Sequence, residues 1–219
     1  MKTKEELVKI PAGKVTLEGN LIVPKDVKGI VLFAHGSGSS RFSPRNRYVA
    51  EVLQKARLAT LLMDLLTQEE EEIDMQTGHL RFDIEFLAKR LINAMGWLKK
   101  NTKTKNLTKG YFGSSTGAGA ALIAAAKHPN DVDAIVSRGG RPDLAMQYLS
   151  KVKAPTLLIV GGDDLPVIEM NKEAMEKLHA VKLKIVPGAT HLFEESGTLE
   201  EVARLAADWF MLYLRHKKK

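Results

Sequence analysis

Residues 109–127 read KGYFGSSTGAGAALIAAAK, and this stretch decides the fold. Its first part, Lys109 to Phe112, is a short apolar run typical of a buried strand. Its last part, Thr116 to Lys127, is an alanine-rich helix that His128-Pro129 ends. Between the two lies a G-x-S-x-G motif with Ser115 at its centre. The stretch therefore predicts a strand, a tight turn with a serine, and a helix in direct succession.

A serine on a sharp strand-to-helix turn has its hydroxyl exposed at the carboxyl end of the strand. Ser115 is therefore the candidate nucleophile. A second interpretation is a glycine-rich helix cap, with Ser114 or Ser115 as the N-cap residue. Two phosphate-binding patterns fail, because no Lys follows Gly117 or Gly119 and the dinucleotide fingerprint lacks its third glycine.

Outward from this stretch, apolar strands alternate with amphipathic helices, which predicts a mainly parallel central sheet with helices on both faces, an α/β fold. The expected strands are 30–34, 58–63, 109–112, 134–136, 155–160 and 183–186, after a hairpin of 15–17 and 21–23 around residues 18–20. The expected helices are 47–56, 81–100, 116–127, 166–179 and 199–216. Ligands bind at the carboxyl ends of the strands in such sheets.

Two of these helices show an apolar face that we expect to be buried. The face of the helix 81–100 comprises Phe82, Phe86, Leu87, Leu91, Ile92 and Trp97, and that of the helix 199–216 comprises Val202, Leu205, Ala206, Trp209, Phe210 and Leu212. Residues 64–80 are a long, polar and acidic connection on the same rim, which either covers the site or is simply solvated.

A serine nucleophile needs a base, and the base needs a third group that holds its tautomer. Asp164 follows the strand 155–160, and His191 follows the strand 183–186. In the alternative interpretation, Asp164 only caps the helix that follows it, and His191 is an ordinary loop histidine. The order Ser115, Asp164, His191 is the one that the hydrolases of this α/β class use.

An oxyanion hole should complete the site, with backbone N–H groups of Thr116 and of the loop 35–40. We expect Ser37 to be the second donor, with Gly38 as the less favoured choice. His35 begins this loop and is expected to be structural, because His191 already supplies the base.

Composition narrows the class of protein. A length of 219 residues is typical of one domain, here residues 1–219. The absence of cysteine excludes disulfides, thiolate nucleophiles and cysteine-ligated metal sites. Four of the seven net positive charges come from Arg215 and Lys217–Lys219, so nucleic acid is not an expected partner. Neither a membrane span nor a secretory signal is evident, and we expect a cytoplasmic location without membrane association.

Together, His35-Gly36, Gly113-x-Ser115-x-Gly117, Gly161-x-x-Asp164 and Gly188-x-x-His191 resemble the α/β-hydrolase superfamily, and more narrowly the dienelactone-hydrolase-like family. The resemblance covers nearly the whole chain and implies a compact α/β-hydrolase fold without a large cap domain. Dienelactone hydrolases have a cysteine nucleophile, whereas this chain has a serine, which favours a serine esterase.

Other polar residues carry weaker signals. Arg138 follows a strand end, so it either binds an acidic group of a substrate or pairs with Asp143 or Asp163. His79 has no second histidine at ligand spacing, so no metal is expected.

The expected function is hydrolysis of small ester, lactone or thioester substrates through an acyl-enzyme, with no cofactor. The expected partner is a small-molecule acyl substrate. The sequence leaves open whether the chain also forms a homodimer. The alternative from another class is a non-catalytic member of the fold that binds or regulates.

Overall fold

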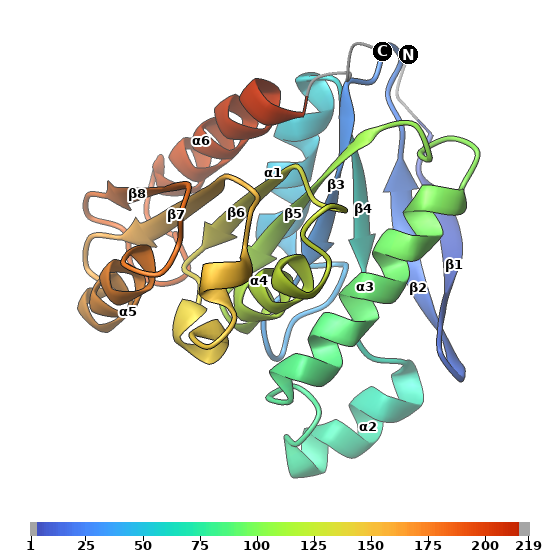
Figure 1. The fold of residues 1–219 in the computed structure, drawn as a ribbon, viewed down its shortest axis with the longest axis horizontal. Helices are drawn as coiled ribbons and strands as arrows, with labels where there is room; N and C mark the ends of the chain where they lie inside the picture. Colours follow the sequence, from blue (N-terminus) through green and yellow to red (C-terminus); the bar gives the residue numbers. More distant parts are fainter. Residues whose placement is uncertain (1–3, 215–219) are drawn as a thin grey trace.

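In the computed structural model, which describes residues 4–214, the strands form one eight-stranded sheet in the order β1-β2-β4-β3-β5-β6-β7-β8 (Figure 1). The strands are β1 Glu6–Ala12, β2 Val15–Ile22, β3 Gly29–Ala34, β4 Leu58–Met63, β5 Thr108–Ser114, β6 Ala134–Arg138, β7 Thr156–Gly161 and β8 Val181–Val186. From β4 to β8 every pairing is parallel, and only β1 and β2 run antiparallel to their neighbours. The predicted, mainly parallel α/β sheet is confirmed.

Helices cover both faces of the sheet (Figure 1). They are α1 Pro44–Lys55, α2 Gln68–Thr77, α3 Ile84–Lys100, α4 Thr116–Lys127, α5 Leu165–Met175 and α6 Thr198–Tyr213. In the view of Figure 1, α3, α4 and α5 lie in front of the sheet, α1 and α6 lie behind it, and α2 lies beyond its lower edge. Only two short 3₁₀ turns, Pro142–Ala145 and Leu149–Lys151, separate β6 from β7, so no cap domain is inserted there.

The central strands are buried on both faces, which explains their continuous apolar sequence. Successive residues of β3 alternate between two cores: Ile30 and Leu32 pack toward α3 and α4, whereas Val31 and Phe33 pack toward α1 and α6. Phe33 also contacts Phe112 of β5, with ring centroids 4.9 Å apart. Two cores therefore fix the sheet between its helical layers.

The predicted N-terminal hairpin is wrong in its register. β1 pairs with β2, and the turn lies at Gly13, whose φ of 76° favours glycine. Residues 15–22, expected as two short strands, form one continuous strand. Gly19 lies inside this strand, and the residue is a glycine because a Cβ atom there would lie only 2.9 Å from Leu61 Cδ1. A glycine at a close approach was thus misinterpreted as a turn.

The connection 64–80 contains a helix that was not predicted. Thr67 and Glu70 form a capping box at the start of α2, a signal present in the sequence as T-x-x-E. Asp74 is fully buried and accepts hydrogen bonds from the Leu80 N–H and, through its Oδ2 at 2.5 Å, from Arg81 Nε. The segment is therefore folded and not a solvated loop.

Several helix ends also differ from the prediction. α1 begins at Pro44 and not at residue 47, because Ser43 accepts the Asn46 N–H as its N-cap. α3 begins after its cap Asp83, which leaves Phe82 outside the helix and 62% exposed. α5 ends at Met175, and the expected end of the last helix, at residue 216, lies outside the described residues. Of the apolar face predicted for α6, Leu212 is half exposed, which corrects that assignment.

Candidate active site

Ser115 occupies the turn between β5 and α4, in a strained backbone conformation. Its φ is 50° and its ψ is −123°, a region that non-glycine residues rarely adopt. A Cβ atom on Gly113 would lie 2.4 Å from Ala118 Cα, and one on Gly117 would lie 2.3 Å from the His35 carbonyl oxygen. Both glycines of the motif are therefore sterically required. Ser115 is the N-cap residue of α4, but its side chain makes no cap hydrogen bond, so its hydroxyl is not used to cap the helix.

The structure brings Ser115, His191 and Asp164 into one chain of hydrogen-bonding contacts. His191 Nε2 lies 3.3 Å from Ser115 Oγ, and His191 Nδ1 lies 2.6 Å from Asp164 Oδ2. The Asp164 side chain is 14% exposed and that of His191 is 37% exposed. All three follow the carboxyl ends of strands, which are β5, β7 and β8. The arrangement can pass the proton of a serine hydroxyl to an imidazole that a carboxylate orients.

The loop that carries His191 is held from two sides. Glu195 accepts hydrogen bonds from the Thr190 N–H, at 3.1 Å, and from the Thr190 hydroxyl, at 2.6 Å, and these bonds keep the pKa of Glu195 below its usual value. Gly139 lies under the imidazole, where a Cβ atom would be 3.5 Å from His191 Nδ1. Phe193 is buried with a φ of 56°, which turns the chain back into the core. This support was not predicted.

The loop after β3 lies against the turn of Ser115. A Cβ atom on Gly36 would lie 3.1 Å from Ser115 Cβ and 3.2 Å from the Ser114 carbonyl oxygen, so a side chain there would have to displace the serine turn by a few tenths of an ångström. Thr116 is the first residue of α4, where a backbone N–H has no acceptor within the helix. The Ser37 N–H, however, donates to Thr116 Oγ1 at 2.9 Å. The backbone N–H of the expected second oxyanion donor is therefore bonded to the Thr116 hydroxyl in this structure.

His35 lies at the start of this loop and is 8% exposed. Its Nε2 accepts the Leu65 N–H at 3.1 Å, and its Nδ1 lies 2.9 Å from the Gly36 carbonyl oxygen, to which it donates. Burial lowers the pKa of this imidazole, which stays neutral. His35 fastens the loop to the end of β4, a structural role.

Arg138 is buried at the end of β6, and neither of its two predicted pairings is found. Asp143 instead binds Arg141 through two hydrogen bonds of 2.8 and 2.7 Å, and Asp163 is exposed. Burial, and in second place the charge of Arg45, lower the pKa of Arg138 to about 10.

An open cleft of about 770 Å³ lies beside the loop after β3. Its walls come from the β1–β2 hairpin, from the loop 38–42 and from α2, and its lining includes Gly38 but not Ser115. Arg41 crosses the wall, where it binds Asp64 and Glu18. The segment expected to cover the rim thus forms one wall of this cleft. His79 Nδ1 lies 2.6 Å from Thr77 Oγ1, and within residues 4–214 no group of three His, Asp or Glu side chains is arranged to hold a metal.

No helix among residues 4–214 has the length and apolar character needed to cross a membrane.

Among solved structures, the chain is similar to a dienelactone hydrolase from Anabaena variabilis, with 64% identity and a TM-score of 0.97 over 98% of this chain and 100% of that one. It shares its fold with a lid-less α/β serine hydrolase from Xanthomonas campestris, at 18% identity and a TM-score of 0.78 over 100% and 99% of the two chains.

Two curated relatives from Mycobacterium tuberculosis, which carry the provisional name of phosphoribosyl transferase, are 58% identical over 212 residues. The match covers 96% of this chain but only 47% of theirs, so the chain spans about half the length of these relatives. The dienelactone hydrolase family matches residues 17–213. With nearly the entire sheet and the Ser115 turn inside this match, the chain belongs to the dienelactone hydrolase family.

Proposed function

We propose that this protein is a serine hydrolase that cleaves ester, lactone or thioester bonds of small substrates through an acyl-enzyme on Ser115. The observation that carries the proposal is the chain of contacts from Ser115 Oγ to His191 and on to Asp164, at 3.3 and 2.6 Å. A hydroxyl is a weak nucleophile at neutral pH, and an oriented imidazole beside it supplies the missing base.

In the proposed reaction, Ser115 Oγ attacks the substrate carbonyl carbon while His191 Nε2 takes its proton. The Nδ1–H of His191 donates to Asp164, which fixes the tautomer and stabilises the imidazolium. His191 then protonates the leaving alcohol, thiol or lactone oxygen as the acyl bond to it breaks. A water molecule, deprotonated by the same imidazole, attacks the acyl-enzyme and releases the acid and the free serine.

The negative oxygen of the tetrahedral intermediate needs preorganised donors. The Thr116 N–H is one donor in this proposal, because the first residue of a helix has no internal acceptor. Ser37 serves as the second once its N–H exchanges Thr116 Oγ1 for the oxyanion, which is the stronger acceptor. The strained turn at Ser115 and the close packing of Gly36 hold these groups around one point.

The name of the Mycobacterium relatives suggests another chemistry, but it describes proteins about twice as long as the matched part. Within this chain, the glycines around Ser115 fit a serine turn and not a phosphate-binding pattern. We therefore assign the hydrolase chemistry to this chain and no phosphoribosyl transfer.

A fluorophosphonate probe tests the proposal, because it reacts with an activated serine whatever the natural substrate is. We expect one adduct, located on Ser115 by peptide mass spectrometry, in the wild-type protein and none in Ser115→Ala or His191→Ala. Ser114→Ala is a matched control, since Ser114 is the neighbouring serine and its hydroxyl donates to Asn46 Oδ1 at 3.0 Å. Folded wild-type protein that gives no adduct, or an adduct elsewhere, would favour a non-catalytic binding role.

A further inference from the structure

The hydroxyl of Thr116 accepts a backbone N–H that the proposed reaction needs for the substrate oxygen. Thr116 is the first residue of α4 and is 4% exposed. Its Oγ1 accepts the Ser37 N–H at 2.9 Å, across 79 positions of the chain. A backbone N–H carries one hydrogen and donates one full hydrogen bond. The Ser37 N–H therefore cannot serve the oxyanion and the threonine hydroxyl at the same time.

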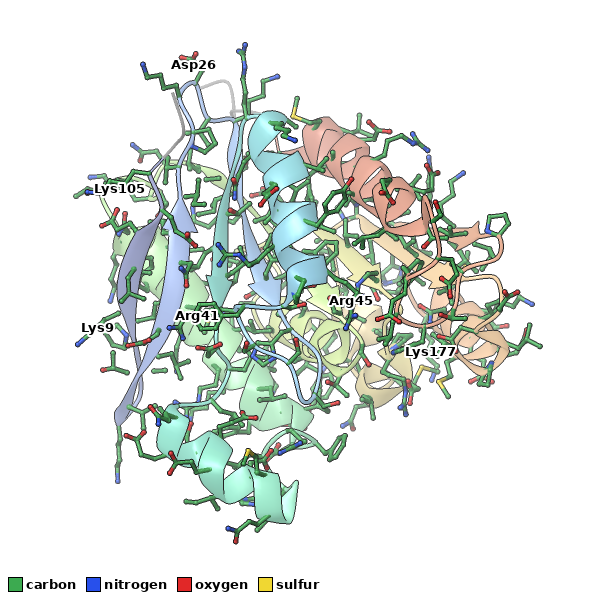
Figure 2. All side chains as sticks on the ribbon, turned by 180° about the vertical axis from the view of Figure 1, so that it is seen from behind. Lys9, Asp26, Arg41, Arg45, Lys105 and Lys177 are labelled. Atoms are coloured by element: carbon green, nitrogen blue, oxygen red, sulfur yellow. The ribbon has the colours of Figure 1, made fainter. Side chains whose placement is uncertain are left out.

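The loop that carries Ser37 is held at both of its ends. At its start, His35 Nε2 accepts the Leu65 N–H at 3.1 Å. At its far end, Arg41 Nη2 donates to Glu18 Oε2 at 2.6 Å, and Figure 2 shows Arg41 beside β2, the strand that contains Glu18. The contact between the loop and α4 is therefore made by an anchored segment.

A tight turn within this loop fixes the position of the Ser37 N–H. The Ser39 N–H donates to the Gly36 carbonyl oxygen at 3.2 Å, which closes a turn of four residues. Gly38, the third residue of this turn, has a φ of 69°, a conformation that favours glycine. Ser37 is thus the second residue of a defined turn that faces the start of α4.

The serine turn on the other side of the contact is also held firmly. The Ser115 carbonyl oxygen accepts the N–H groups of Ala118 and Arg141, both at 3.1 Å. A Cβ atom on Gly117 would lie 2.3 Å from a carbonyl oxygen just beyond β3. The movable part is the Thr116 side chain, because threonine in a helix has two χ1 rotamers open to it. The contact can therefore be exchanged by rotation about one bond.

The hydroxyl and the oxyanion compete for the same donor with unequal strength. A hydrogen bond to a charged acceptor is about twice as strong as one between neutral groups. The neutral carbonyl oxygen of a bound ester has no such advantage over the Thr116 hydroxyl. The exchange is therefore driven only as negative charge develops on the substrate oxygen, in the transition state. A contact of this kind changes kcat and kcat/KM by the same factor and leaves KM unchanged.

We propose that the Thr116 hydroxyl closes the oxyanion hole in the resting protein and is displaced by the substrate oxygen as that oxygen becomes negative. This inference rests on the proposed function and adds a side chain that controls its rate. Both acylation and deacylation pass through an oxyanion, so the hydroxyl slows both steps. The role of this side chain is separate from that of the Thr116 backbone N–H, which a change of side chain to valine or serine retains.

The first test replaces the hydroxyl by a methyl group of similar size, in Thr116→Val. Ser37 is exposed, so water takes the place of the lost acceptor in the resting protein. We expect kcat and kcat/KM for p-nitrophenyl acetate and butyrate to rise by about 2- to 12-fold, the range of one net hydrogen bond, with an unchanged KM. Thr116→Ser keeps the hydroxyl and should keep the wild-type kcat. A folded Thr116→Val protein with an unchanged or lower kcat overturns the proposal.

Thr60→Val is the matched control for the loss of a threonine hydroxyl. Thr60 of β4 is fully buried, and its Oγ1 also accepts an N–H, that of Gln54 Nε2 at 2.8 Å. We expect Thr60→Val to have the wild-type kcat, because this hydroxyl bonds a side chain of α1 and not the loop 35–40. An equal rise of kcat in Thr60→Val and Thr116→Val would mean that general loosening causes it, and would overturn the proposal.

Labelling by the fluorophosphonate probe separates this test from that of the proposed function. A wild-type protein that is not labelled on Ser115 contradicts the hydrolase itself. Normal labelling of Ser115, together with a Thr116→Val protein that is no faster than the wild type, overturns only the closure of the oxyanion hole by Thr116.

A further measurement uses the wild-type protein and needs no variant. Ser115 Oγ adds to the carbonyl carbon of hexyl trifluoromethyl ketone, the serine proton passes to His191, and the carbonyl oxygen becomes an oxyanion. We expect the amide proton signal of Ser37 in an NMR spectrum to move downfield when this adduct forms, because a charged acceptor replaces the hydroxyl. Thr116→Val should bind the ketone about 2- to 12-fold more tightly. A Ser37 signal that stays unchanged in the adduct means that its N–H remains on Thr116, and this result overturns the proposal.

Discussion

The unpaired charge of Arg138 leads to a stability prediction that does not depend on knowing a substrate. Burial and the nearby charge of Arg45 lower the pKa of Arg138 to about 10 from 12.5. Since one pKa unit corresponds to 1.36 kcal/mol, the charged side chain lowers the free energy of unfolding by about 3 kcal/mol. Methionine has a similar length and no charge. It gives up the contact of the cation with Phe193, worth about 1 kcal/mol.

We therefore expect Arg138→Met to raise the free energy of unfolding by about 1–2 kcal/mol. For a domain of this size, that gain corresponds to roughly 2–8 °C in melting temperature. The folded-state pKa of Arg138 is lower than the unfolded one, so the cost is fully present below about pH 10 and fades only above it. The gain should consequently be constant between pH 6 and 8.

Urea unfolding and thermal melting of the wild-type, Arg138→Met and Arg141→Met proteins measure this effect. Arg141 is half-buried and paired with Asp143, so its replacement should cost between 0 and about 1 kcal/mol and give no gain. If Arg138→Met is as stable as the wild-type protein or less stable, the guanidinium has a compensating partner and the reasoning is refuted.

Three other substitutions, with Gly96→Ala as a control, test the site and its surroundings. Asp164→Asn should lower kcat for an activated ester by about 10³- to 10⁴-fold, because His191 loses its orienting carboxylate. Gly117→Ala should destabilise the fold by about 1–3 kcal/mol in urea unfolding, since the new Cβ atom meets two backbone carbonyl oxygens. In the control, Gly96→Ala on the open face of α3 should stabilise the fold by about 0.5–1 kcal/mol. Burial lowers the pKa of His35, so the unfolded chain binds more protons than the folded one as the pH falls. The free energy of unfolding should therefore fall below pH 6.5 by up to about 1.4 kcal/mol per pH unit, and this fall should be smaller in His35→Gln.

Each of these expectations has a result that would contradict it. An Asp164→Asn enzyme with nearly wild-type kcat would mean that another group orients the histidine. A Gly117→Ala protein as stable as Gly96→Ala would mean that the backbone around the turn relaxes freely. Equal pH slopes for His35→Gln and the wild-type protein would mean that His35 titrates normally in the folded state.

The sequence predicted the parts of this molecule in which local signals agree with the tertiary structure. The run Ile30–Phe33 and the strand, turn and helix around the G-x-S-x-G motif were predicted because apolar length, bounding glycines and helix start all indicate the same elements. Strand ends then place the residues after them at one edge of a parallel sheet. That geometric rule is why the contact of Asp164 with His191 could be anticipated from chain positions 27 residues apart.

The errors lie where long-range contacts override local signals. Gly19 has the local character of a turn, but its close approach to Leu61 keeps it in a strand. The helix α2 is a different case, because its capping box, Thr67 and Glu70, was a local signal that the acidic composition of the segment obscured. The engaged N–H of Ser37 depends on a threonine rotamer 79 residues away, which no sequence pattern encodes.

Some of the features that lower stability lie close to the serine turn. Ser115 and Phe193 both have positive φ, and Arg138 is a buried charge without a partner. Ser115 and Arg138 lie at the carboxyl ends of β5 and β6, and Phe193 lies in the loop after β8. Two other non-glycine residues with positive φ, Asp26 and Arg57, lie before β3 and β4, at the opposite end of the sheet. Strain persists only where the surrounding structure enforces it, and it concentrates where chemistry requires it. The strained serine turn and the unpaired arginine both lie beside the proposed nucleophile, and they support the proposal that stability is given up for reaction at this edge of the sheet.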